Sequence, residues 1–289
     1  MKVLILGGAG LLGHKAYQVF SKEFDTYVTF RNFEDRLKEK KLFDENKVFN
    51  DIDAFDFESI KKIIAGLKPY AVLNCIGIIK QLKESQDHKL SIYINSLFPH
   101  LLAELCEDAG SRLIHISTDC VFSGKKGNYK EEDPCDAGDL YGLSKYLGEI
   151  NHPGCLTLRT SIIGHELFTN FSLVDWFLSN EGKTVSGYTN AIFTGFPTVT
   201  LCNEIVRIIK SRPSLNGLYN ISSEKISKYD LLNLIKKTYH RNIEIEPFKD
   251  FYCDRSLDSE KYRKETGFIP EGWEEMIKEM HEDNLKNLS

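Results

Sequence analysis

The sequence places a tyrosine and a lysine, Tyr141 and Lys145, one helical turn apart in the segment DLYGLSKYLGE. A phenol has a pKa of about 10 in water, so it moves protons slowly at neutral pH unless a nearby cation stabilises its phenolate. An ammonium group one turn further along the same helix face can do this. The spacing therefore predicts a proton-transferring phenol, although the same pattern also occurs on ordinary surface helices.

A hydroxyl side chain joins this pair in the stretch HISTDCVFSG, where Thr118 directly follows the apolar run at 112–117. Open α/β sheets bind their ligands beyond the carboxyl ends of the strands. A threonine in that position can donate a hydrogen bond to a carbonyl oxygen of a substrate. His115, within the same run, is expected to be structural.

A glycine-rich loop stands between the apolar run KVLIL and the helix-like segment LLGHKAYQVFSK. Its glycines permit a tight turn, a close approach of backbone to a pyrophosphate, and close packing of the helix on the strand. The phosphates would meet the free N–H groups at the helix N-terminus. The residues predicted to bind the coenzyme here are Gly7, Gly10, Leu11, Leu12 and Gly13.

The residues after the second predicted strand indicate which coenzyme binds. An acidic residue there bonds the ribose 2′-hydroxyl, whereas an arginine accommodates a 2′-phosphate. The strand TYVTF runs into Arg31 and Asn32, which favours NADPH. Glu34 or Asp35 could still reach a ribose, so NADH remains an alternative.

Further coenzyme contacts are expected after the next two predicted strands. Asp51 and Ile52 follow the run KVFN and could border the adenine. Cys75, Ile76 and Gly77 end the run AVLNCIG, where the glycine lets the coenzyme pass close to the backbone.

Short apolar runs alternate with amphipathic segments, which predicts an α/β, Rossmann-type doubly wound parallel sheet with a smaller C-terminal substrate lobe. Residues 1–164, with about 196–222, are predicted to form the dinucleotide-binding domain. Residues 165–195 and 223–289 are predicted to form the lobe, with Trp176 and Phe177 in its core or Trp176 against the sugar. Asp56 and Ser227 are expected to cap helices, and Pro99 to bend or break a long one.

Composition excludes several classes of protein. The net charge of −5, with both signs interspersed, provides no basic stripe for nucleic acid and no polybasic segment for a membrane surface. No apolar run is long enough to span a bilayer. Seven cysteines without close CxxC pairs indicate reduced thiols, and therefore a soluble cytoplasmic protein. No cluster is specific enough to assign a metal site.

Four segments together resemble the dTDP-4-dehydrorhamnose reductases and related extended short-chain dehydrogenases that act on nucleotide sugars. They are STDCVFSG, YKEEDPCDAGDLYGLSKYLGE, LTLRTSIIG and SLDSEKYRKETGF. The resemblance implies that Thr118, Tyr141 and Lys145 form a catalytic triad for reduction of a C4 ketone. Tyr141 would protonate the oxygen, Lys145 would lower the tyrosine pKa and bind the ribose, and Thr118 would orient the carbonyl.

Differences between this sequence and related families reduce the number of reactions that the chain could catalyse. The related 4,6-dehydratases carry an Asp-Glu pair after the strand-end threonine, whereas this chain has Asp119 and Cys120. Cys120 occupies the position of the epimerising cysteine of GDP-fucose synthases. No histidine stands at the matching downstream position, where Asp175 falls nearby instead. Cys120 is therefore expected to fill space or form part of the wall around the substrate, with proton abstraction next to a ketone as the alternative.

Part of the substrate side is predicted from position in the resembling reductases. Lys80 and Gln81 follow the predicted cofactor-side strand and could face the hexose or lie on the surface. FTGFPTVTL would meet the sugar nucleotide, and Arg255 would face its diphosphate, with a salt bridge to Asp258 or Glu260 as the alternative. The residues expected to bind substrate are Lys80, Gln81, Thr118, Asp119, Cys120, Thr194, Phe196 and Arg255.

The leading hypothesis is therefore an NADPH-dependent reductase of a nucleoside-diphosphate 4-keto-6-deoxy sugar, with dTDP, UDP or GDP as the nucleotide and an N-acetylated hexosamine allowed. Two alternatives remain open: an epimerase using bound NAD, and a non-catalytic regulatory subunit like the beta subunit of methionine adenosyltransferase. A homodimer is compatible with the sequence.

Overall fold

The alternating apolar and amphipathic segments fold as alternating strands and helices. A computed structural model describes residues 1–80 and 86–288. It contains two compact units. Unit 1 comprises Met1–Ser117, Asp139–Leu158 and Cys202–Leu218, and unit 2 comprises Thr118–Gly138, Arg159–Leu201 and Tyr219–Ser289. Gln81, a predicted substrate residue, lies outside the described part of the chain.

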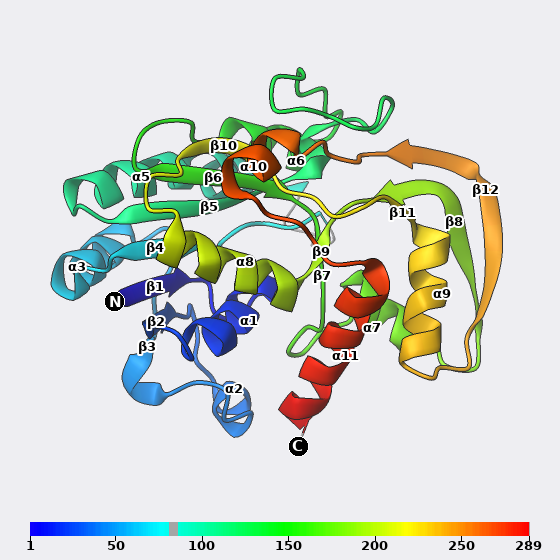
Figure 1. The fold of residues 1–289 in the computed structure, drawn as a ribbon. Coiled ribbons are helices and arrows are strands. Elements are labelled where there is room, and N and C mark those ends of the chain that lie inside the picture. Colours follow the sequence, from blue (N-terminus) through cyan, green and yellow to red (C-terminus); the bar gives the residue numbers. More distant parts are fainter. Residues whose placement is uncertain (81–85, 289) are drawn as a thin grey trace. The chain divides into compact units, whose positions relative to one another are not determined.

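The apolar runs of unit 1 form a seven-stranded sheet in the order β10-β6-β5-β4-β1-β2-β3 (Figure 1). The strands are β1 Lys2–Leu6, β2 Asp25–Thr29, β3 Val48–Phe49, β4 Ala71–Asn74, β5 Arg112–Thr118, β6 Cys155–Thr160 and β10 Gly217–Asn220. β1 pairs in parallel with β2 and β4, β2 with β3, and β4 with β5. This is the predicted Rossmann-type α/β fold, which the structure confirms. Its strand order brings the loops after β1, β4 and β5 to one edge.

Several helices connect these strands, and Asp56 and Pro99 lie near helix ends. The helices are α1 Leu11–Phe20, α2 Asp35–Glu39, η1 Glu45–Lys47, α3 Phe57–Leu67, α4 His88–Ser91, η3 Ile92–Leu97, α5 Phe98–Asp108, α6 Leu140–Leu147 and α8 Thr198–Ser211. The Asp56 side chain caps α3 by accepting a hydrogen bond from the Ser59 N–H, as predicted. The long helix predicted around Pro99 runs without a gap from His88 to Asp108, but it changes to a π-helix at η3 shortly before the proline, and Pro99 lies in the first turn of α5.

The core of unit 1 forms where apolar faces of α3 and α5 pack together with sheet residues. Leu4, Ile60, Ile64, Phe98 and Leu102 are among its fully buried members. Burial of each such side chain is worth about 1.5–3 kcal/mol, so the sheet and its helices hold the loops at the strand ends in fixed positions.

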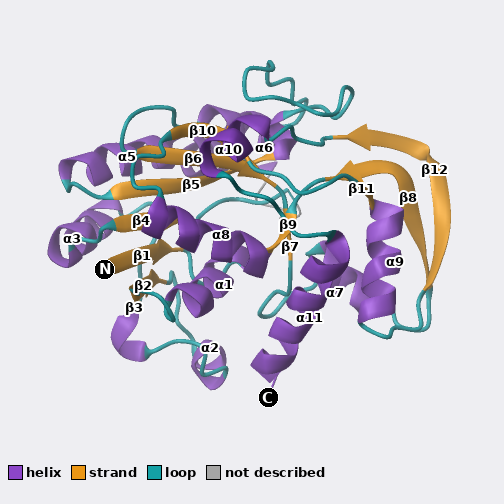
Figure 2. Cartoon of the chain, in the orientation of Figure 1, coloured by secondary structure: helices purple, strands orange, loops and turns teal. Residues whose placement is uncertain are grey.

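Unit 2 is built around a smaller sheet of three strands in the order β11-β8-β12. Its elements are η4 Asp119–Val121, β7 Ile162–Ile163, α7 Leu173–Leu178, β8 Thr184–Phe193, β9 Phe196–Pro197, β11 Ile226–Ser227, α9 Lys228–Thr238, β12 Glu244–Asp254, α10 Glu260–Thr266 and α11 Trp273–Leu288 (Figure 2). Ser227 caps α9 as predicted. Phe177 is fully buried, as expected, but Trp176 is 39% exposed, so its assignment to the core was wrong. No described helix is long and apolar enough to cross a membrane.

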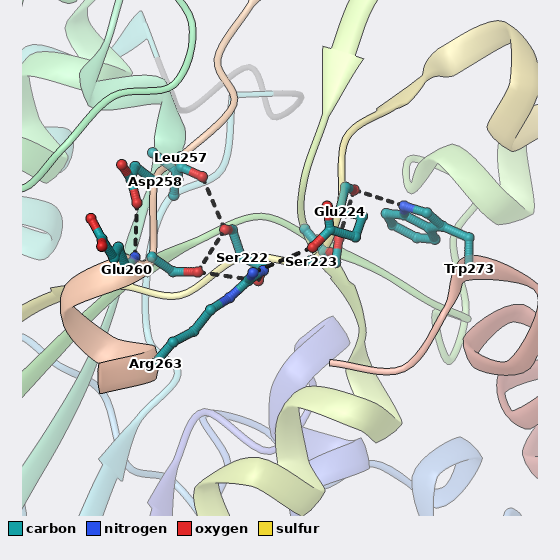
Figure 3. Close-up of polar contacts among 10 residues, drawn as sticks. Ser222, Ser223, Glu224, Leu257, Asp258, Glu260, Arg263 and Trp273 are labelled. Carbon is teal, nitrogen blue, oxygen red and sulfur yellow. Dashed lines mark hydrogen bonds and ion pairs between the residues drawn. The ribbon is translucent and has the colours of Figure 1, made fainter. Parts of the chain in front are cut away.

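A buried serine ties the segment after β10 to the segment after β12. Figure 3 shows Ser222, whose hydroxyl lies 2.9 Å from the Leu257 carbonyl oxygen and 2.9 Å from Ser259 Oγ. Ser222 is 2% exposed, so water cannot replace these bonds. The contact holds the backbone two residues beyond Arg255.

Two helices also bond to this segment. Arg263 of α10 donates to the Ser222 carbonyl at 3.2 Å and to Glu224 Oε1 at 3.3 Å (Figure 3). The Trp273 indole N–H, at the start of α11, donates to the Glu224 carbonyl at 2.8 Å. Residues 222–224 therefore join α10 and α11 within unit 2.

Replacing Ser222 by alanine should lower the free energy of unfolding by about 1–3 kcal/mol, because the buried Leu257 carbonyl loses a donor that nothing replaces. Urea denaturation followed by circular dichroism measures the change. Ser214→Ala, at an exposed serine, serves as the matched control. Equal stability of the two variants would show that the Ser222 bonds contribute nothing net.

Candidate active site

The loop after β1 has the backbone geometry that a pyrophosphate requires. Gly7 has a φ of +90°, and a Cβ added to Gly13 would lie 2.1 Å from the Gly7 carbonyl oxygen. Helix α1 begins after Gly10, which has no side-chain cap, and its first turn contains no acidic residue. The peptide N–H groups and the positive end of the helix dipole are thus left for an anionic ligand. The loop fits the diphosphate of a nicotinamide dinucleotide.

The loops after β2 and β3 lie together beside this site. The Ile52 N–H donates to the Phe30 carbonyl at 2.9 Å, which brings Asp51 and Ile52 next to the start of the loop carrying Arg31. Arg31 is exposed, and Asp51 has a left-handed backbone with a φ of +58°. Two of the predicted coenzyme segments are therefore adjacent.

Glu34, one of the two acidic alternatives to Arg31, bonds to its neighbours in the sequence. Glu34 accepts a hydrogen bond from the Asn32 side chain at 2.7 Å and pairs with Arg36 Nε at 2.8 Å. Each carboxylate oxygen keeps a second lone pair, so these two bonds leave Glu34 able to accept a bond from a ribose hydroxyl.

The loop after β4 packs directly on the glycine loop. A Cβ at Gly7 would lie 3.1 Å from Ile76 Cγ1 and 3.3 Å from the Cys75 backbone, so only glycine permits this approach without displacement. The Asn74 side chain accepts a bond from the Ile76 N–H at 3.1 Å. Cys75, Ile76 and Gly77 are thus placed beside the phosphate-binding turn.

Lys145 occupies a buried position on α6 and is fixed to the sheet. Its ammonium donates to the Ile116 carbonyl of β5 at 2.7 Å. Burial lowers the pKa of Lys145 from 10.5 to about 8, opposed by the charge of Glu149. Tyr141 is half-buried one turn earlier on the same helix. Ile116 lies two residues before Thr118, so the bond positions the phenol-bearing helix on the strand that ends in the threonine.

Lys80, a further residue predicted to bind substrate, lies at the N-terminus of α6. The Asp139 side chain caps the helix by accepting a bond from the Gly142 N–H at 2.8 Å. Its other oxygen accepts a bond from Lys80 Nζ at 2.6 Å. Lys80, expected on the substrate side, is therefore tied to the cap of the helix that carries Tyr141.

Sequence reasoning missed Asn95, which joins the loop after β4 to α6. It lies within the π-helix η3 and is 1% exposed. Its amide bonds both backbone groups of Ile78, at 2.9 Å and 3.1 Å, and donates to Ser144 Oγ at 3.2 Å. A Cβ at Gly148 would lie 1.9 Å from the Asn95 carbonyl oxygen. An asparagine within the mainly apolar run IYINSLF was the available signal.

His115 is fully buried in β5, as expected of a structural residue. Its Nδ1 lies 3.2 Å from the amide nitrogen of Asn74, which can only donate, so the ring proton resides on Nε2. Burial, with the charge of Lys145, holds the His115 pKa well below its ordinary value. The ring is neutral and supports Asn74 from within the sheet.

The last residue of β5 and the residues directly after it form a cluster in unit 2. Thr118 Oγ1 lies 3.2 Å from Asp119 Oδ1 and accepts a bond from the Cys120 N–H at 3.1 Å. Arg255 donates to the Phe122 carbonyl at 2.8 Å, and its Nη1 lies 3.8 Å from Cys120 Sγ. The structure thus brings Arg255 together with Thr118, Asp119 and Cys120.

Two other predicted substrate residues are interior residues of unit 2. Thr194 is 4% exposed, and its hydroxyl accepts a bond from the Leu257 N–H at 3.2 Å. Phe196 is 1% exposed, and its ring centroid lies 5.9 Å from that of Phe268. Any contact they make with a sugar nucleotide remains a prediction.

Comparison with known proteins gives a consistent family match. A family model described as the RmlD substrate binding domain matches residues 1–285. Methionine adenosyltransferase 2 subunit beta of Xenopus laevis is 26% identical over 243 residues, which are 80% of this chain and 70% of that protein. Spore coat polysaccharide biosynthesis protein SpsK of Bacillus subtilis is 26% identical over 239 residues, covering 78% and 83% of the two chains.

Solved structures share the fold over nearly the whole chain. A hypothetical dTDP-4-dehydrorhamnose reductase from Sulfolobus tokodaii superposes with a TM-score of 0.78 at 25% identity, covering 94% of this chain and 98% of that one. The dTDP-4-dehydrorhamnose reductase of Bacillus anthracis, solved in complex with NADP, also has a TM-score of 0.78, at 22% identity and coverage of 98% and 99%.

Because the Lys145 ammonium is buried, the free energy of unfolding should depend on pH. The folded state releases the Lys145 proton at about pH 8, whereas the unfolded chain holds it up to about 10.4. Between these values the unfolded state binds more protons, so wild-type stability gains with rising pH. Lys145→Met lacks this gain, and its stability relative to wild type should fall by up to about 3 kcal/mol across that window.

Urea denaturation of both proteins from pH 7 to 9.5 measures the part of this change that develops below pH 9.5, about 2 kcal/mol. Lys61→Met, at an exposed lysine of α3, controls for loss of a charge at the surface. A stability difference between wild type and Lys145→Met that stays constant with pH would contradict the burial of the ammonium.

Proposed function

Because the chain belongs to the RmlD substrate binding domain family, as its motifs predicted, we propose that it reduces the C4 ketone of a nucleoside-diphosphate 4-keto-6-deoxy sugar with NADPH. One observation carries the proposal. The half-buried Tyr141 stands one turn from a buried ammonium, and that ammonium is bonded to the strand that ends in Thr118. A helix with a surface role has no need to bury a lysine.

The proposed chemistry assigns a task to each side chain. The bound coenzyme supplies the hydride. The Tyr141 hydroxyl donates its proton to the ketone oxygen, and the Lys145 ammonium favours the phenolate that remains. The Thr118 hydroxyl orients the carbonyl by hydrogen bonding. Solvent then returns a proton to Tyr141.

The coenzyme would lie along the loops at the carboxyl edge of the main sheet. Gly7, Gly10 and Gly13 would approach the diphosphate, with Leu11 and Leu12 supplying N–H groups. Asp51 and Ile52 would border the adenine, Cys75 to Gly77 would line the path of the coenzyme, and Lys145 would bind the nicotinamide ribose. We assign dinucleotide binding to residues 1–164 with about 196–222, and substrate binding to residues 165–195 and 223–289.

The sugar nucleotide would meet the cluster after β5. Arg255 beside Cys120 and Asp119 offers a cation for the diphosphate, and Lys80 lies at the cap of α6. The relative SpsK is named for polysaccharide biosynthesis, which supports a product used for surface polysaccharide. The nucleotide would be dTDP, UDP or GDP, and an N-acetylhexosamine is included among the sugars.

A regulatory role is the second candidate, because methionine adenosyltransferase subunit beta is among the relatives. A regulatory subunit has no need of a proton donor or a buried cation. This chain has all three proposed catalytic residues, Thr118, Tyr141 and Lys145, which favours an enzyme over a regulatory subunit.

The proposal is tested by following NADPH oxidation with enzymatically generated 4-keto-6-deoxy derivatives of dTDP-glucose, UDP-N-acetylglucosamine and GDP-mannose, each with NADH in parallel. Rapid oxidation with one of them identifies the reaction and its nucleotide. Tight NADPH binding without turnover of any of them would favour the regulatory candidate.

Tyr141→Phe should reduce kcat by about 100-fold or more and leave the Kd for NADPH within about twofold, because only the proton donor is lost. Stopped-flow turnover and fluorescence titration of NADPH give the two values. Tyr146→Phe, at an exposed tyrosine of the same helix, is the matched control. Near wild-type kcat in Tyr141→Phe would exclude its role as the donor.

Arg31→Asp should lower the preference for NADPH over NADH by about 10-fold or more, since a carboxylate repels a 2′-phosphate and can bond a 2′-hydroxyl. The measurement is the ratio of kcat/KM for the two coenzymes. Arg241→Asp, an exposed arginine in unit 2, makes the same charge change elsewhere. An unchanged ratio in Arg31→Asp would remove this residue from phosphate recognition.

A further inference from the structure

Asp119 is a buried carboxyl group that directly follows the strand-end threonine. It is 7% exposed. Four neighbours in unit 2 interact with it: Thr118 and Cys120 on its own segment, Ser161 after β6, and Arg255 after β12. The reduction as proposed above assigns Asp119 no part in proton movement.

The hydroxyl of Thr118 has one proton to give and two lone pairs to receive. One lone pair accepts the Cys120 N–H at 3.1 Å. An ionised Asp119 can only accept, so the bond of 3.2 Å between Thr118 Oγ1 and Asp119 Oδ1 then uses the single Thr118 proton. In that state the hydroxyl cannot donate to a substrate carbonyl.

Protonation of Asp119 reverses this bond. The carboxylic acid donates to the second lone pair of Thr118 Oγ1, and both lone pairs are then satisfied by protein donors. The Thr118 proton is released from Asp119 and becomes available to the ketone oxygen. No atom needs to move far, because the same two oxygens remain paired.

We propose that Asp119 is a positioning residue that acts through Thr118, and that its protonated form directs the Thr118 proton towards the ketone oxygen of the substrate. This inference rests on the proposed reductase function. It gives the reaction a titrating group, Asp119, in addition to Tyr141 and Lys145.

The surroundings of Asp119 keep the proton on it to higher pH than on an ordinary aspartate. Burial raises the Asp119 pKa, and the Ser161 hydroxyl, the Arg255 charge, Thr118 and Cys120 act in the opposite direction. The protonated, active form is favoured at low pH. The kcat for reduction should therefore fall as pH rises through the Asp119 pKa.

The first test is the pH profile of kcat for wild type and Asp119→Asn, over the whole pH range in which both proteins stay folded, with NADPH and the accepted keto sugar. The asparagine amide can donate to Thr118 and does not titrate. We expect wild-type kcat to fall by about fivefold or more as pH rises through the Asp119 pKa, and that of Asp119→Asn by less than about twofold over the same range. The same fall in both proteins would overturn the proposal.

Two further variants keep the test decisive if Asp119→Asn folds poorly. Ser161→Ala removes a donor that favours the carboxylate, so it should shift the fall in kcat to higher pH. Thr118→Val removes the proton that Asp119 controls, so its residual activity should lack the fall. An unshifted profile in Ser161→Ala, or a retained fall in Thr118→Val, would contradict the proposal.

A measurement without turnover separates this inference from the proposed function. Failure of wild type to oxidise NADPH with any keto sugar counts against the reductase assignment alone. The carboxyl carbon of Asp119, assigned by its absence in Asp119→Asn, can be titrated by ¹³C NMR together with the Thr118 methyl group. Both signals should titrate with one pKa, and independent behaviour would overturn the coupling.

Discussion

The bond between the Lys145 ammonium and the Ile116 carbonyl is the contact on which the candidate site depends. A buried ammonium is costly unless it is hydrogen-bonded, so this 2.7 Å contact fixes α6 against β5. The helix then carries Tyr141, and the strand continues into Thr118. Asn95 and Ser144 extend the same constraint to the loop after β4, because the Asn95 amide bonds both backbone groups of Ile78. Proton donor and coenzyme loop are thereby positioned by one set of buried polar contacts.

Burial shifts the pKa values of two groups in opposite directions, and both shifts are towards neutral pH. It lowers the pKa of Lys145 and raises that of Asp119, because each loses hydration of its charged form. Lys145 lies in unit 1 and Asp119 in unit 2. The strand β5 links them along the chain, since Ile116 accepts the bond from one and Thr118 faces the other. Perturbed groups of this kind cluster at functional sites more often than at structural ones.

Much of the fold could be predicted from the sequence, because hydrophobic periodicity and capping residues are local. Asp56 and Ser227 cap the helices expected of them, and the glycine loop lies between β1 and α1. Contacts made by tertiary packing could not be predicted. The π-helix at Ile92–Leu97, the bonds of Asn95, the pairing of Lys80 with Asp139 and the exposure of Trp176 all depend on which segments meet in three dimensions. The roles of Glu34 and Asp119 likewise follow from their bonding partners and burial, which periodicity does not specify.

Transfer of deuterium from the coenzyme to the sugar tests the central claim most directly. The protein would be incubated with each stereoisomer of [4-²H]NADPH and an accepted 4-keto-6-deoxy sugar nucleotide, and the product examined by NMR. Ketone reduction predicts one deuterium at C4 of the hexose from one stereoisomer only, with none at C3 or C5. A product without deuterium at C4, or one that takes up hydrogen from solvent at C3 or C5 without consuming NADPH, would contradict the reductase assignment and point to epimerisation.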